Sequence, residues 1–142
     1  MQYGHLHFLV EASDATALSR GMQAMAIVAA RRINRATGRR GKVFAYRFHA
    51  TAITNPRQAR NALAYILCNW RRHREDLQSD RARRATLDPY ASALAFDGWH
   101  SGPFATPPGY EPLPVSAART WLLAEGWRRH GLLDPWAVPG GL

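Results

Sequence analysis

Apolar residues recur at intervals of three and four positions in two stretches of the chain, and this spacing predicts two amphipathic helices. The first helix is expected to begin after a cap at Ser13 or Asp14 and to stop at Gly38. Its apolar stripe comprises Leu18, Met22, Met25, Val28 or Ala29, and Ile33. A helix with one such stripe is expected to cover one face of a sheet.

The second helix has the clearer starting signal. Asn55 can cap it, Pro56 occupies the first helical position, and Gln58 stands where a capping-box side chain would. We expect this helix to run to about His73. Its buried arc is predicted to contain Ala59, Leu63, Ile66, Leu67 and Trp70.

The rest of the chain has other patterns. Residues 3–11 and 42–54 are rich in residues typical of strands, and they predict one strand followed by a second strand or hairpin. Residues 74–114 are charged at first and then rich in Pro and Gly, which predicts a loop wrapped over the preceding domain and held by its aromatics. A final helix is expected over residues 116–130, with Gly131 as its stop. Its apolar side would contain Trp121, Leu122, Leu123 and Trp127.

Two histidines stand out in the first predicted strand. His5 and His7 are two residues apart, so in an extended strand both imidazoles face the same side while Leu6 faces the other. Two imidazoles on one face can hold a metal ion. Most such pairs are ordinary surface residues, so the pair by itself leaves both interpretations open.

The second predicted helix carries two further residues that could act together with the two histidines. Tyr65 and Asn69 are four residues apart, so they lie one turn above the other on a flank beside the buried arc, with His73 at the next turn. An amide oxygen is a suitable third ligand for a hard divalent ion held by two imidazoles, and the phenol could attack a phosphate polarised by that ion. The alternative is an amphipathic flank with an exposed tyrosine.

The charge of the chain points to a phosphate-bearing partner. Lys and Arg number 19 against 10 Asp and Glu, which gives a formal charge of +9, and Lys42 is the sole lysine. Guanidinium groups pair with phosphates in bidentate fashion, so nucleic acid is the expected partner. The residues predicted to contact phosphates are Arg47, Arg57, Arg60, Arg71 and Arg72.

Other features of the sequence exclude several kinds of site and several classes of protein. A single cysteine, Cys68, rules out an intramolecular disulfide and a multi-cysteine zinc site. The sequence contains neither a secretory signal pattern nor an apolar run that could span a membrane, which predicts a cytoplasmic protein. The predicted organisation is a catalytic domain over residues 1–73, followed by an irregular segment and a C-terminal helix over 74–142.

Taken in order, these motifs resemble the HUH single-tyrosine transposases. The resemblance is closest to the REP-associated tyrosine transposase branch of the insertion-sequence-200-like transposases. The matching stretches are His5–Glu11, the arginine-rich helix, Val43–His49 and Asn61–Asn69. The resemblance implies an α+β fold: a ferredoxin-like antiparallel sheet with helices on one face. The family's first β-α unit is missing before the histidine strand, so the domain is expected to be shortened at its N-terminus. Either the chain is a truncated or misannotated reading frame, or a partner supplies the sheet edge, and members of the family commonly form a homodimer.

The resemblance also implies a mechanism. A divalent ion, Mg or Mn, would be held by His5, His7 and Asn69, and Tyr65 would act as the nucleophile on single-stranded or hairpin DNA. The expected activity is DNA nicking and strand transfer through a 5′-phosphotyrosine intermediate. Because metal binding needs neutral imidazoles, activity is expected to fall below the ordinary histidine pKa of about 6.5. The alternative is a truncated or domesticated relative that binds hairpin DNA without catalysis.

Overall fold

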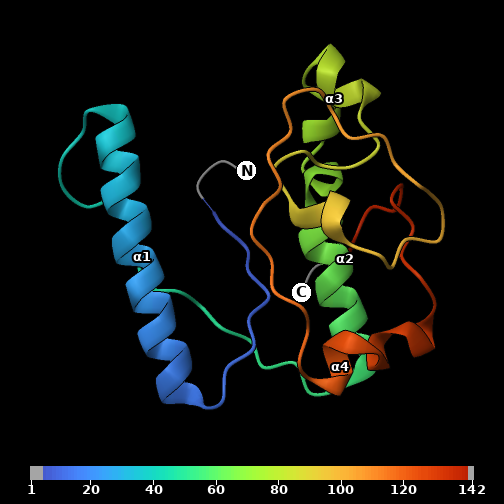
Figure 1. Cartoon of the computed structure of the whole chain (residues 1–142), viewed down its shortest axis with the longest axis horizontal. Coiled ribbons are helices and arrows are strands. Elements are labelled where there is room, and N and C mark those ends of the chain that lie inside the picture. Colours follow the sequence, from blue (N-terminus) through green and yellow to red (C-terminus); the bar gives the residue numbers. More distant parts are fainter. Residues whose placement is uncertain (1–4, 141–142) are drawn as a thin grey trace. The chain divides into compact units, whose positions relative to one another are not determined.

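The computed structural model describes residues 5–140 of the chain. Two α-helices of several turns dominate it, α1 (Ala15–Thr37) and α2 (Pro56–Arg72) (Figure 1). The remaining helical elements are short: η1 (Glu75–Leu77), α3 (Asp80–Arg84), η2 (Ser92–Ala95), α4 (Trp121–Ala124) and η3 (Gly126–His130). The described residues divide into two compact units. One contains residues 5–9 and 53–140, and the other contains residues 10–52.

The predicted sheet is wrong for the part of the chain that the structure describes. Neither the histidine segment nor residues 42–54 form a strand there, so the α+β ferredoxin-like architecture is replaced by helices and loops. Positions 3 and 4 of the first predicted strand lie outside the described residues. A strand needs a neighbour to satisfy its backbone N–H and C=O groups, and composition does not supply one. Residues 45–52 instead stay exposed, Tyr46 to 91%.

Helix α1 confirms the predicted caps. The side chain of Asp14 accepts a hydrogen bond from the Ala17 amide at 2.8 Å, and Gly38 ends the helix in the left-handed conformation with φ of 67°. No residue of α1 is fully buried, and Ile27, Val28 and Ile33 are all more than 40% exposed. The apolar stripe of α1 therefore has no sheet to cover.

Helix α2 also begins as predicted. Asn55 accepts a hydrogen bond from the Gln58 amide at 2.9 Å, and the Gln58 side chain accepts one from the Thr54 amide at 2.9 Å. The helix ends at Arg72, with His73 as its C-cap. Three members of the predicted arc are buried, Ala59, Leu67 and Trp70, whereas Leu63 and Ile66 are half-buried.

The core of this unit forms around α2. It is built from Ala59, Leu67, Cys68, Leu87, Ala93, Trp99, Trp127 and Leu133. The segment predicted as a wrapped loop supplies much of it: the Trp99 indole is packed between the rings of Phe96 and Phe104 and donates to the Ala93 carbonyl at 2.9 Å. Trp99 also belongs to the core cluster that includes Leu67 and Cys68 of α2, and Phe96 and Phe104 pack against that cluster. Figure 1 shows α3 near one end of α2 and α4 near the other.

The predicted C-terminal helix over residues 116–130 is wrong in extent. Helicity begins only at Trp121, and it breaks at Glu125, whose φ of −136° and ψ of −43° separate α4 from η3. At Gly126 a Cβ would press against the Trp121 ring, so glycine allows the chain to turn there. Trp127 is buried, but Trp121 is 47% exposed. Two short helical elements, α4 and η3, therefore replace the single predicted helix.

The last segment of the chain is tied back to this core. Trp99 and Leu133 form an isolated parallel bridge, in which the Leu133 amide donates to the Gly98 carbonyl and the His100 amide donates to the Leu133 carbonyl, both at 2.9 Å. Within residues 5–140, no helix is both long and apolar enough to cross a membrane.

Candidate active site

The histidine segment and α2 meet inside one unit, and their contact defines the candidate site. The imidazole of His7 lies edge-on to the Tyr65 ring, with 5.1 Å between the ring centroids and 90° between the planes. The His5 ring lies 6.1 Å from that of His7. This separation is close to the roughly 6.6 Å that two residues span in an extended chain, so the two rings are neighbours without a sheet, and His7 is the one in contact with α2.

Asn69 lies one helical turn beyond Tyr65, and its environment is unusual. It is only 5% exposed, and neither its amide nitrogen nor its amide oxygen has a hydrogen-bond partner among the described residues. A buried polar group in this state costs about 1–3 kcal/mol. The sequence predicts Asn69 on a flank beside the buried arc, and the structure buries it.

The electrostatics of the site favour the neutral form of His7. Burial lowers the pKa of His7, and the neighbouring charges of His5 and His73 lower it further. His73 stands at the C-cap of α2, where its backbone amide donates to the Asn69 carbonyl at 3.2 Å. A divalent metal ion binds the neutral form of imidazole, so the lowered pKa suits His7 to be a ligand.

The donor set fits a divalent ion of intermediate hardness. Two imidazole nitrogens and one amide oxygen would come from His5, His7 and Asn69, and the unpartnered Asn69 amide is the strongest structural sign of a missing polar neighbour. Within residues 5–140, no group of three or more His, Cys, Asp and Glu side chains is placed to hold a metal ion. The predicted set of His5, His7 and Asn69 therefore has three ligands only when the Asn69 amide is counted.

Three of the predicted phosphate-binding arginines make hydrogen bonds to the chain itself. Arg60 donates to the carbonyls of Gly131 and Leu132 at 3.0 and 3.1 Å, and Arg72 donates to that of Pro139 at 3.1 Å. These bonds hold the C-terminal segment along α2.

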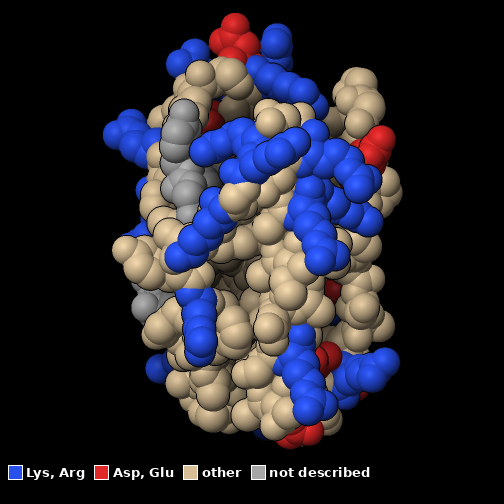
Figure 2. Space-filling model, turned by 90° about the vertical axis from the view of Figure 1, so that its left-hand side faces the viewer, with Lys and Arg blue, Asp and Glu red and all other residues tan. Residues whose placement is uncertain are grey.

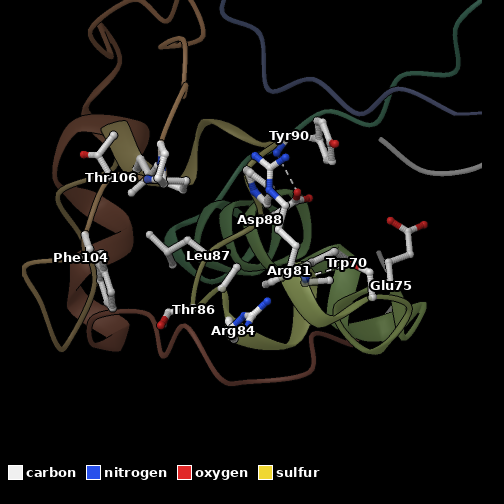
Figure 3. Close-up of a pocket in the computed structure, with 18 of the residues that line it drawn as sticks. Trp70, Glu75, Arg81, Arg84, Thr86, Leu87, Asp88, Tyr90, Phe104 and Thr106 are labelled. Atoms are coloured by element: carbon white, nitrogen blue, oxygen red, sulfur yellow. Dashed lines mark hydrogen bonds between the residues drawn. The ribbon is translucent and has the colours of Figure 1, made fainter.

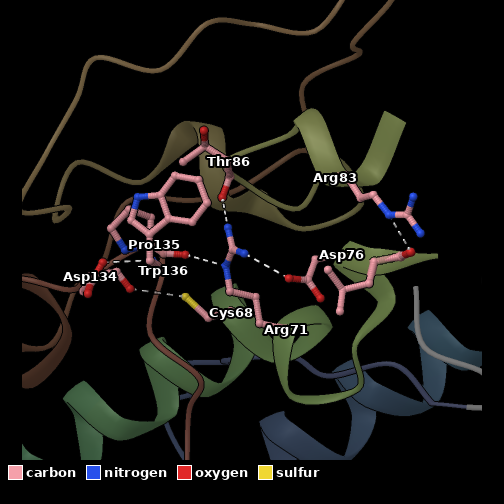
Figure 4. A network of polar contacts seen from close by, with 9 residues as sticks. Cys68, Arg71, Asp76, Arg83, Thr86, Asp134, Pro135 and Trp136 are labelled. Atoms are coloured by element: carbon pink, nitrogen blue, oxygen red, sulfur yellow. Dashed lines mark hydrogen bonds and ion pairs between the residues drawn. The ribbon is translucent and has the colours of Figure 1, made fainter. Parts of the chain in front are cut away.

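Arg71 is the centre of a larger network (Figure 4). Its guanidinium donates to the carbonyls of Pro135 and Thr86, both at 2.7 Å, and pairs with Asp76 at 3.1 Å. It also lies over the rings of Trp70 and Trp136, at 4.9 and 4.6 Å. Only 8% of the side chain is exposed, so its role here is structural.

Exposed basic side chains gather in the other unit. Figure 2 shows a face on which Lys and Arg side chains greatly outnumber acidic ones. The basic residues of the unit formed by residues 10–52 are all exposed: Arg20, Arg31, Arg32, Arg35, Arg39, Arg40, Lys42 and Arg47. Its acidic residues are Glu11 and Asp14. Arg57, in the first turn of α2, is exposed as well.

Neither the Arg71 network nor the burial of Asn69 is evident from the sequence pattern. The acceptors of Arg71 lie between 5 and 64 residues away along the chain, so no local pattern could have shown them. Comparisons with protein families, with curated proteins and with solved structures find no match to this chain.

Proposed function

We propose that this protein is a DNA-nicking and DNA-joining enzyme of the transposase type, in which Tyr65 is the nucleophile. The observation that carries the proposal is the grouping of His5, His7 and Tyr65 in one unit, with the unpartnered amide of Asn69 one turn away. The proposal rests on this grouping of side chains and does not require a sheet.

In the proposed step, the Oη atom of Tyr65 attacks the phosphorus of a single-stranded or hairpin DNA. A bond forms between Oη and phosphorus, the bond from phosphorus to the 3′ oxygen breaks, Tyr65 loses its phenolic proton and the leaving oxygen gains one. The products are a 5′-phosphotyrosine link and a free 3′-hydroxyl, and attack by such a hydroxyl reverses the step and joins strands. The edge-on contact with His7 limits the orientations of the Tyr65 ring.

His5, His7 and Asn69 are the residues that would hold a divalent ion, Mg or Mn. When bound, such an ion polarises a phosphoryl oxygen and stabilises the charge that develops on it. The protein's own contribution is a lowered pKa at His7, which favours its neutral form, and a buried amide at Asn69 without a hydrogen-bond partner among the described residues.

The DNA backbone would be held by exposed basic residues rather than by the structural arginines. Arg57 and the basic residues of the unit formed by residues 10–52 have solvent-exposed side chains, and their charge favours phosphates without base specificity. A DNA substrate of this kind is consistent with a cytoplasmic protein. These same residues support the second candidate function, in which the protein binds hairpin DNA without cutting it.

The deciding experiment is incubation of the protein with end-labelled hairpin DNA and Mn²⁺, followed by a denaturing gel. We expect a covalent protein–DNA adduct with the native protein and none with Tyr65→Phe. Tyr46→Phe is the matched control, since Tyr46 is 91% exposed and lies in the other unit, and it should form the adduct normally.

Further variants separate the two functions. His7→Ala and Asn69→Ala should lose the adduct while retaining DNA binding in a gel-shift assay. Binding by the native protein with no adduct in Mg²⁺ or Mn²⁺ would refute the nuclease and leave the binding protein. An adduct that persists in Tyr65→Phe would show that another residue is the nucleophile.

A further inference from the structure

A separate cavity lies beside the C-terminal end of α2. Its volume is about 690 Å³, within the roughly 300–1,000 Å³ typical of sites for small ligands. It is lined by Trp70, by residues of η1 and α3, by the segment 85–90 and by residues 104–108, all of which belong to one unit. Figure 3 shows Phe104 and Thr106 on one side, Trp70 and Glu75 on the other, and Leu87 between them.

The walls of this cavity suit a flat ring. Phe104 is half-buried against Trp99 and keeps part of its ring accessible, whereas Trp70 and Leu87, only 4% and 6% exposed, are fixed by the core and present an edge to the cavity. Pro89, Pro107 and Pro108 also line it. Aromatic and apolar walls held by a rigid core stack well against nucleobases, at little cost in side-chain entropy.

Cations stand at the same cavity. Arg81 and Arg84 from α3 both line it and are exposed, and neither belongs to an ion pair within the described residues. Arg83 on the same helix does not line the cavity; it donates to the Leu77 carbonyl at 3.1 Å and pairs with Asp80. Two of the three arginines of α3 are therefore placed for an anionic group of a ligand.

The cavity also contains a hydrogen-bond acceptor. Oδ1 of Asp88 accepts the Tyr90 amide at 2.8 Å, which fixes the carboxyl group in the wall. Burial raises the pKa of this carboxyl group. A fixed carboxyl group beside apolar walls can accept a hydrogen bond from an exocyclic amino group of a base.

We propose that this cavity binds a nucleotide, with the base between Trp70, Leu87 and Phe104 and the phosphate on Arg81 and Arg84. The nucleotide can be a free mononucleotide or an unpaired unit of single-stranded DNA. Trp70 directly follows Asn69 on α2, so the second source would hold a strand at the same helix that carries Tyr65 and Asn69. That link rests on the proposed function, whereas nucleotide binding does not.

Calorimetric titration of the Tyr65→Phe protein with the four deoxynucleoside monophosphates tests the proposal without any cleavage. We expect saturable binding that is about tenfold weaker for deoxyribose 5-phosphate, which lacks the base, and for the deoxynucleosides, which lack the phosphate. Arg81→Gln and Arg84→Gln should each weaken binding about tenfold, and Arg83→Gln, the matched control, should leave it unchanged.

The two sources are separated by a single-stranded oligonucleotide and the same strand with one abasic site. Weaker binding of the abasic strand than of the intact strand identifies the DNA unit, and equal binding of the two strands, together with saturable binding of mononucleotides, identifies the free nucleotide. The proposal is overturned if deoxyribose 5-phosphate binds as well as the nucleotides, or if Arg83→Gln weakens binding as much as Arg81→Gln. Failure of Tyr65 to form an adduct would leave this test unaffected.

Discussion

At the scale of single residues, the candidate site combines a buried amide and a ring contact that serve no evident structural purpose. Asn69 is buried without a hydrogen-bond partner among the described residues, which reduces stability, and a ligand would relieve that cost. The sequence could place Tyr65 and Asn69 on one flank because helix periodicity is local. It could not show that His7 would reach Tyr65, since that contact joins distant parts of the chain.

Asn69→Leu tests whether Asn69 is kept for binding rather than for stability. Leucine has the same branched skeleton of four side-chain heavy atoms and no polar atoms, so we expect the free energy of unfolding to rise by about 1–3 kcal/mol in urea denaturation. Any increase in melting temperature caused by Mn²⁺ should disappear in this variant. Asn61→Leu, on the exposed side of α2, should leave both quantities nearly unchanged. A loss of stability in Asn69→Leu would show that the amide has a structural partner.

Cys68 provides a second test at this scale. Its thiol is buried in the core, and burial raises its pKa from 9.0 to about 11. At pH 8 the reactive thiolate is therefore about 100-fold scarcer than for an unshifted thiol. Alkylation by iodoacetamide at pH 8 should be at least that much slower in the native protein than in urea, as followed by mass spectrometry. Similar rates in both states would contradict a buried, high-pKa thiol.

At the scale of elements, the two long helices follow from local sequence and the predicted strands do not. Asp14 and Gly38 delimit α1, and Asn55 begins α2, because capping depends on residues within one turn. Strand formation depends on a partner that can lie anywhere in the chain, and residues 42–54 find none among the described residues. The Arg71 network shows the same limit, because the acceptors come from three separate segments.

Arg71→Met tests whether Arg71 is structural. Methionine keeps the apolar stem but removes the charge, so Asp76 loses its partner and the carbonyls of Pro135 and Thr86 lose their donors. We expect a loss of about 3 kcal/mol in the free energy of unfolding, measured in urea. Arg57→Met, at an exposed position, should unfold like the native protein and bind DNA more weakly. Arg71→Met with native stability and weaker DNA binding would instead identify a phosphate contact.

At the scale of the whole molecule, the core of the unit around α2 depends on close packing of aromatic side chains. Gly98 lies against the rings of Trp127 and Phe96, and it also accepts the amide hydrogen of Leu133. A methyl group there would overlap both rings. The Gly98 backbone thus keeps the Trp99 segment and the C-terminal segment together.

Gly98→Ala should therefore destabilise this unit by about 2 kcal/mol, through overpacking, and lower its melting temperature. Gly21→Ala is the matched control, because no atom lies within 4 Å of a Cβ at that position of α1. It should preserve or slightly raise stability, as alanine favours helix over glycine. Equal behaviour of the two variants in thermal unfolding followed by circular dichroism would refute the packing argument.

The sequence by itself determined the start and end of α1, the start of α2, the flank shared by Tyr65 and Asn69, and the excess of exposed positive charge. These features depend on helix periodicity, capping and composition, which act over a few residues. The tertiary structure alone decided that residues 42–54 form no strand, that His7 lies on Tyr65, that Asn69 is buried and that Arg71 is held by its own chain. Each of these depends on segments that are distant in sequence, and their pairing is selected by the packing of the core rather than by any local pattern.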